Sequence, residues 1–125
     1  MGGRSGNGNR NSNTSTQETA RRTLQGLELT SAEATVNKTA FQKVGNGNWE
    51  LTGPYETGAQ ILDETGSTRA LREGFMPNQK VYSVQTWGQN PGDVRTSYHT
   101  RLNDAKAAAK EEVKEWLKSV TRPRT

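Results

Sequence analysis

Aliphatic side chains are scarce in this chain, and their scarcity limits how large a core it can build. Leu, Ile, Val and Phe together account for only 18 of its 125 residues, a smaller share than the roughly one fifth below which disorder is the first expectation. Trp49, Trp87 and Trp116 compensate in part, because each indole can bury about 150–250 Å². We therefore expect one small domain with a thin core, accompanied by segments that contribute little to it.

The N-terminal segment is the clearest of these. Residues 1–15 consist mainly of Gly, Asn and Ser, with no aliphatic residue beyond the first methionine. Such a segment has nothing to bury against the entropy of ordering, so we predict a disordered tail. For residues 16–38 we predict a short helix and a connector. The helix is expected to start at a capping box between Ser15 and Glu18, and to stop at Gly26.

The rest of the chain alternates short β-type runs with turn residues. Strands are favoured over residues 41–44, 49–52, 59–63, 80–87 and 94–100. Two segments fit either a helix or a strand, namely residues 30–38 and 68–73. Apolar residues at helical spacing predict a final helix from about Asn103 to Ser119. We predict an α+β domain over residues 39–120, with a basic tail at residues 121–125. Its expected core is a small antiparallel β-meander of four to six strands, with the C-terminal helix packed on one face.

The residue inventory argues against several kinds of chemistry. Cysteine is absent and His99 is the only histidine, which removes disulfides, thiol catalysis, Cys-ligated zinc and a His-rich metal site. No nucleophile-elbow, zinc-protease, phosphate-loop or dinucleotide motif occurs. We predict no enzymatic activity, no catalytic residue, no metal and no cofactor. Without a membrane-length apolar run or a secretory signal, we expect no membrane partner and a cytoplasmic (or viral or host cytosolic) location.

Positive charge is concentrated in the second half of the chain. Residues 65–110 carry seven basic and three acidic side chains, whereas residues 1–64 carry six basic and seven acidic ones. In the strand before the last helix, alternation places Val94 and Tyr98 on one face and Arg95 with His99 on the other. We predict that Val94 and Tyr98 pack under the helix, which turns the arginine face outward.

The neighbouring strand is expected to add further polar and aromatic side chains to that outward face. Arg pairs phosphates bidentately and an indole stacks on bases, so we predict a nucleic-acid contact surface there. Its residues are Arg95, Arg101, Trp87, Gln85 and His99, joined by Lys80, Arg69 and Arg72.

The order of elements near the C-terminus has a parallel among known domains. A strand ending at Trp87, a Gly-Asp turn, a strand ending at Thr100 and an Ala/Lys-rich helix from Asn103 follow one another. Over roughly residues 79–118 this layout resembles the sheet-plus-helix arm-binding domains of phage-type integrases. The resemblance rests on the order of these elements alone.

We therefore predict a small accessory binding protein without enzymatic activity, with nucleic acid as its ligand. The alternative is a protein-interaction or assembly module, such as a viral structural or host-inhibiting protein. A thin core and a flexible tail fit that alternative equally well. A salt titration separates the two, because phosphate binding weakens steeply with salt.

Overall fold

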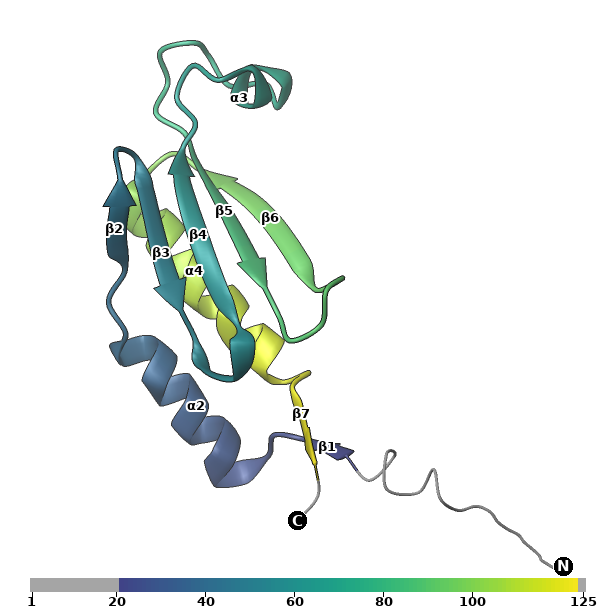
Figure 1. The fold of residues 1–125 in the computed structure, drawn as a ribbon. Coiled ribbons are helices and arrows are strands. Elements are labelled where there is room, and N and C mark those ends of the chain that lie inside the picture. The colour runs from purple at the N-terminus through teal and green to yellow at the C-terminus, as the bar shows by residue number, and fades with distance from the viewer. Residues whose placement is uncertain (1–20, 124–125) are drawn as a thin grey trace, which may run out of the picture.

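The computed structural model describes residues 21–123. Its centre is a five-stranded antiparallel sheet in which neighbours in space are also neighbours in sequence (Figure 1). The strands are β2 (Gln42–Gly45), β3 (Asn48–Thr52), β4 (Gly58–Asp63), β5 (Tyr82–Trp87) and β6 (Val94–His99). Helix α4 (Leu102–Leu117) crosses one face of the sheet, and helix α2 (Gly26–Lys38) packs beside α4. The predicted α+β meander with a C-terminal helix on one face is confirmed.

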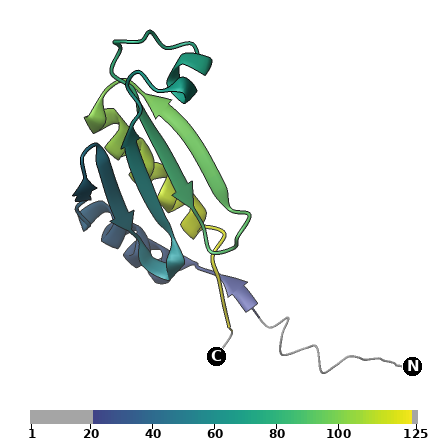
Figure 2. The same ribbon diagram turned by 45° about the horizontal axis from the view of Figure 1, so that its top comes forward.

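The core lies between α4 and the middle strands. Across the sheet, Ile61 of β4 stands next to Val84 of β5, and both are fully buried beneath α4. The helix contributes Ala105, Ala109, Val113 and Leu117 to this contact, and two of these four residues are alanines. Small side chains let the helix axis approach the sheet closely, so a chain with few aliphatic residues still closes its core. Figure 2 shows α4 lying along one face of the sheet, while the other face is left without a helix.

Both ends of the described chain meet in a second, two-stranded sheet. Strand β1 (Arg21–Thr23) pairs antiparallel with β7 (Thr121–Pro123). The predicted basic tail at residues 121–125 is therefore wrong for residues 121–123, which form a strand. Gly26 begins α2 instead of ending a helix, and its φ of +54° is one that glycine adopts without strain. The predicted tail and capping box lie outside the described residues.

Residues 64–81 leave the sheet between β4 and β5 and project beyond its end (Figure 1). We call this segment the lobe. It contains the short helix α3 (Thr68–Arg72), whose N-cap Ser67 accepts a hydrogen bond from the backbone N–H of Ala70 at 3.0 Å. The segment that fitted either a strand or a helical turn is thus helical, and residues 30–38 belong to α2. A short 3₁₀ turn (Pro54–Glu56) joins β3 to β4.

The carboxylate of Glu28, in the first turn of α2, forms ion pairs with both β1 and β7. We call this arrangement the clamp. Its Oε1 is 2.6 Å from Nη1 of Arg22 in β1, and its Oε2 is 2.6 Å from Nη1 of Arg122 in β7. The hydrogen bond from Arg22 holds the pKa of Glu28 below its ordinary value, and the same bond raises the pKa of Arg22. One side chain therefore fastens two strands that lie at opposite ends of the sequence.

The ion pairs of Glu28 should make the thermal stability of the protein depend on pH. At neutral pH, Glu28→Gln should lower the melting temperature because the charge of the clamp is lost. The folded-state pKa of Glu28 is lowered, so its contribution is complete above the ordinary Glu pKa of about 4.3 and disappears as the pH falls through the lowered value. Thermal unfolding of both proteins, in steps from neutral to acidic pH, should show melting temperatures that converge. A constant difference at every pH would contradict the assignment.

Candidate interaction surface

Strand register separates the side chains that the sequence placed together. Gln85 pairs with Thr96, whereas Arg95 pairs with Thr86, and directly opposed residues in antiparallel strands share a face. Thr86 is fully buried under α4, so Arg95 lies on the helix side, as does His99. The prediction that Arg95 and His99 face outward is wrong.

The reason is the position of β6 at the edge of the sheet. There the helix side is only partly covered, and Arg95 remains exposed although it points toward α4. Val94 is 49% exposed on the other face. Since neither face of an edge strand is closed, the alternation of apolar and polar residues in β6 does not reveal which face borders the helix. Gln85 and Trp87 do lie on the helix-free face, as predicted.

Arg95 belongs to a network that joins β6 and β5 to α4. Its guanidinium carbon lies 4.9 Å from the centroid of the Trp116 ring, within the range of a cation–π contact. The indole Nε1 of Trp116 donates to Oγ1 of Thr86 at 3.0 Å, and this hydroxyl donates to Oε1 of Glu112 at 3.2 Å. The buried threonine hydroxyl is thus satisfied on both sides.

Ser97 and His99 extend the same network along β6. Oγ of Ser97 lies 3.2 Å from Oε2 of Glu112 and 2.9 Å from Nε2 of His99. A serine hydroxyl has one proton, and a carboxylate can only accept, so Ser97 donates to Glu112 and His99 donates to Ser97. An activated serine nucleophile requires the reverse, with the proton passing from serine to histidine. The contacts are those of a network that fastens the edge strand to the helix.

The remaining predicted residues lie elsewhere. Arg69, Arg72 and Lys80 belong to the lobe, where Arg69 approaches Glu64 with 3.6 Å between Nη1 and Oε2. Arg101 is the N-cap of α4. The eight predicted residues therefore occupy three places, namely the helix-free face, the α4 side of β6, and the lobe with the start of α4. The structure does not assemble them into one surface.

The helix-free face of the sheet is notable for its lack of charge. We call it the open face. Its outward positions on β3 to β6 are Asn48, Glu50, Thr52, Gly58, Gln60, Leu62, Ser83, Gln85, Trp87, Val94, Thr96 and Tyr98. Among these described positions, Glu50 alone is charged. The other positions are amides, hydroxyls, two aromatic rings, Gly58, Leu62 and Val94. The buried hydroxyl of Ser83 donates to the carboxylate of Glu64 in the lobe at 3.0 Å.

The indole of Trp87 lies against Gly58 of the adjacent strand. A Cβ built on Gly58 would lie 2.7 Å from Cζ2 of Trp87 and 2.9 Å from the backbone oxygen of Leu51. Glycine is therefore required at position 58, because the indole occupies the space that a side chain would fill. Trp87 remains partly exposed.

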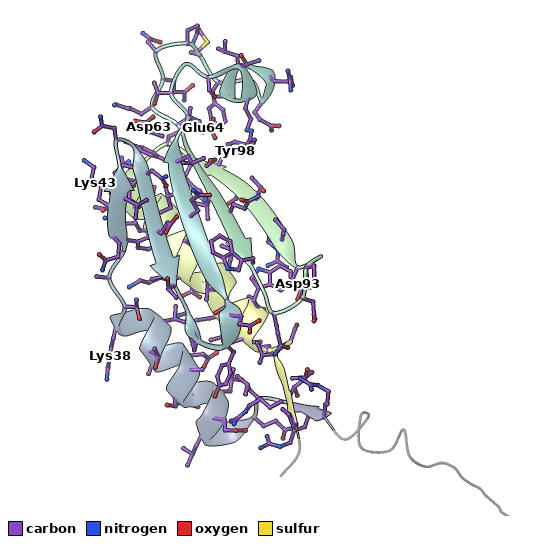
Figure 3. The ribbon with its side chains drawn as sticks, viewed as in Figure 1. Lys38, Lys43, Asp63, Glu64, Asp93 and Tyr98 are labelled. Atoms are coloured by element: carbon purple, nitrogen blue, oxygen red, sulfur yellow. The ribbon has the colours of Figure 1, made fainter. Side chains whose placement is uncertain are left out.

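One aromatic side chain of the lobe, Phe75, contacts the open face at Tyr98. The rings of Phe75 and Tyr98 have centroids 6.2 Å apart at 48°. Figure 3 shows Tyr98 at the end of β6 that lies under the lobe, with Asp93 at the opposite end. Met76 and Leu71 of the lobe are 63% and 44% exposed. Sequence reasoning missed Phe75 and Met76, and it placed Tyr98 under the helix.

Within residues 21–123, no three His, Asp or Glu side chains cluster as metal ligands would, and no pocket indents the surface. No helix in this part of the chain has the length and apolarity needed to cross a membrane. Comparisons with protein-family models, curated proteins and solved structures found no match to this chain.

Proposed function

We propose that this protein is an interaction module that binds a protein partner through the open face of its sheet. The observation that carries the proposal is the near absence of charge there, with Glu50 alone among twelve described outward positions. The chain as a whole is 24% charged, so its composition does not account for such a face. Interface cores are depleted in charged residues and enriched in aromatic ones, as this face is.

The lobe extends the same surface. Phe75 contacts Tyr98, and the exposed side chain of Met76 follows directly in the chain. Exposed apolar side chains that continue an uncharged face fit contact with a protein surface. Phosphate binding requires cations close to the ligand, and no Lys or Arg belongs to the open face. This balance favours a protein partner over nucleic acid.

Nucleic acid remains a second candidate because of the two partly exposed rings. Trp87 and Tyr98 lie on one open sheet face, and such rings are stacking platforms for single-stranded bases. The lobe, whose Phe75 contacts Tyr98, also carries Arg69 and Arg72. In this reading, bases stack on the face while the lobe arginines neutralise phosphates.

A pair of charge insertions tests the protein-binding proposal. Gln85→Lys places a charge in the middle of the open face, whereas Ser119→Lys adds the same charge at an exposed site just after α4. Affinity capture from the native host, quantified for each protein, should retain a specific partner with wild type and Ser119→Lys. Gln85→Lys should lose it. Equal capture by both variants would overturn the proposal.

Fluorescence anisotropy with single-stranded oligonucleotides at about 50 mM salt tests whether the protein binds nucleic acid, the second candidate function. We expect no binding by the wild-type protein. Binding that weakens with salt and with Arg72→Ala would instead establish the nucleic-acid function. In that case, Trp87→Ala should remove about 1–3 kcal/mol of affinity.

A further inference from the structure

The sheet ends in two edges that differ in their fitness for pairing. β2 has four residues and a register irregularity between Lys43 and Gly45, and such a bulge blunts an edge. β6 keeps one continuous register from Val94 to His99 and contains neither Pro, Gly nor Lys. Within residues 21–123 no strand pairs with its outer side, and it is outermost in Figures 1 and 2. A regular edge of this kind is a template for another strand, and the charge of Arg95 on its helix side restricts which strands can pair there.

The hydrogen-bonding pattern defines which backbone groups are free. The N–H of Gly88 donates to the carbonyl of Asp93 at 2.9 Å, so Asp93 belongs to a hydrogen-bonded pair. Because such pairs alternate along antiparallel strands, Arg95, Ser97 and His99 also direct their backbone groups toward β5. The N–H and C=O groups of Thr96 and Tyr98 and the C=O of Val94 consequently point away from the sheet, at the free edge. The N–H of Val94 donates to the carbonyl of Gly92 at 3.0 Å.

Antiparallel pairing of two β6 strands keeps the faces of the sheet matched whenever the two-fold axis passes through a residue, and axes at Thr96 and Ser97 pair most of the strand. With the two-fold axis at Thr96, Thr96 stands opposite Thr96 of the second copy, and Val94 opposite Tyr98. With the axis at Ser97, Val94 lies opposite Thr100, outside the strand, and Arg95 opposite His99. Thr–Thr and aromatic–β-branched pairs are favourable across strands. The second register also contains an aromatic–β-branched pair, Thr96 opposite Tyr98, but it leaves Val94 without an apolar partner. The first register is the better one, and it gives Val94, 49% exposed in the single chain, an apolar neighbour.

Charge favours the same register. With the axis at Thr96, Arg95 of each copy stands opposite Ser97 of the other, on the α4 side of the sheet. Ser97 is hydrogen-bonded to the carboxylate of Glu112 at 3.2 Å. Each guanidinium therefore approaches the carboxylate of the other copy, and symmetry makes this contact twice. Complementary charges across an interface fix its register.

We infer that the partner of the β6 edge is a second copy of this chain, and that the two β6 strands pair antiparallel about an axis at Thr96. The two sheets then form one continuous sheet with both open faces on the same side. The inference concerns the edge of the sheet, so it does not depend on what binds the open face.

Charged variants at the axis test the inference in the full chain. Thr96→Lys and Thr96→Glu each place two like charges directly opposite one another, and each should weaken the dimer at least about tenfold in sedimentation equilibrium. An equimolar mixture of the two should dimerise again, since lysine then faces glutamate. The matched pair is Gln85→Lys and Gln85→Glu, at the exposed neighbour of Thr96 on β5. Each of these should dimerise like wild type.

Two results would overturn the inference. One is a wild-type protein that stays monomeric at its highest soluble concentration. The other is a wild-type dimer that persists in both Thr96 variants, because the dimer would then use another surface. Thermal unfolding confirms that each variant is folded. A Gln85→Lys protein that still dimerises but no longer captures its partner would show that partner binding uses the open face and dimerisation uses the β6 edge.

Discussion

Replacing Trp116 by alanine is expected to lower the free energy of unfolding by about 3–5 kcal/mol, the range for a large packed aromatic. The indole fills the space between α4 and the turn after β5, where a Cβ on Gly88 would lie 2.9 Å from its Cε3. Its Nε1 donates a hydrogen bond to the buried hydroxyl of Thr86, and its ring makes a cation–π contact with Arg95. Such a loss is a large part of the stability of a small domain, and urea unfolding followed by circular dichroism measures it.

Trp116→Phe separates packing from hydrogen bonding at this position. Phenylalanine keeps much of the ring but has no N–H donor for Thr86, so we expect a loss of about 1 kcal/mol. Equal losses for the two substitutions would mean that the hydrogen bond dominates. A Trp116→Ala protein as stable as wild type would contradict the role of the indole in holding α4 to the sheet.

The elements with strong local signals were predictable. The turn Asn90–Asp93 between two β-rich runs gives the hairpin of β5 and β6, and the apolar stripe of the last helix names the residues that α4 buries. These features depend on turn chemistry and side-chain periodicity within a few residues. The Gly/Asn turn between β2 and β3 belongs to the same class.

The pairing of the chain ends was not predictable, because its partners are remote. Arg21 donates through Nε to Oγ1 of Thr121, 100 residues along the chain. Strands β1 and β7 have three residues each, mostly Arg and Pro, and no turn joins them, so they carry no local signal for a strand. The ion pairs of Glu28 with Arg22 and Arg122 could not be predicted for the same reason, because nothing in the sequence near either arginine indicates that the two lie close together.

The candidate surface was half predictable for a related reason. β5 lies inside the sheet, so burial of Val84 on one side correctly placed Gln85 and Trp87 on the other. β6 is an edge strand, and its position in the sheet is a property of the whole topology. The prediction treated Tyr98 as a core residue because it is aromatic, whereas the lobe supplies its contact through Phe75. The error reversed one strand and produced a basic face that the fold does not build.

Ile61→Ala should lower the free energy of unfolding by about 2–5 kcal/mol, as for deletion of a fully buried aliphatic side chain. Ile61 is completely buried beneath α4, in register with Val84. Leu62, the next residue, points to the open face and is only partly buried, so Leu62→Ala should cost about 1 kcal/mol. Urea unfolding of the two variants tests which of the two side chains in β4 faces the core and which faces the open side of the sheet. A one-residue slip exchanges the two faces of a strand. A larger loss at Leu62 than at Ile61 would therefore show that the faces of β4 are assigned the wrong way round. It would also contradict the uncharged face on which the proposed function rests.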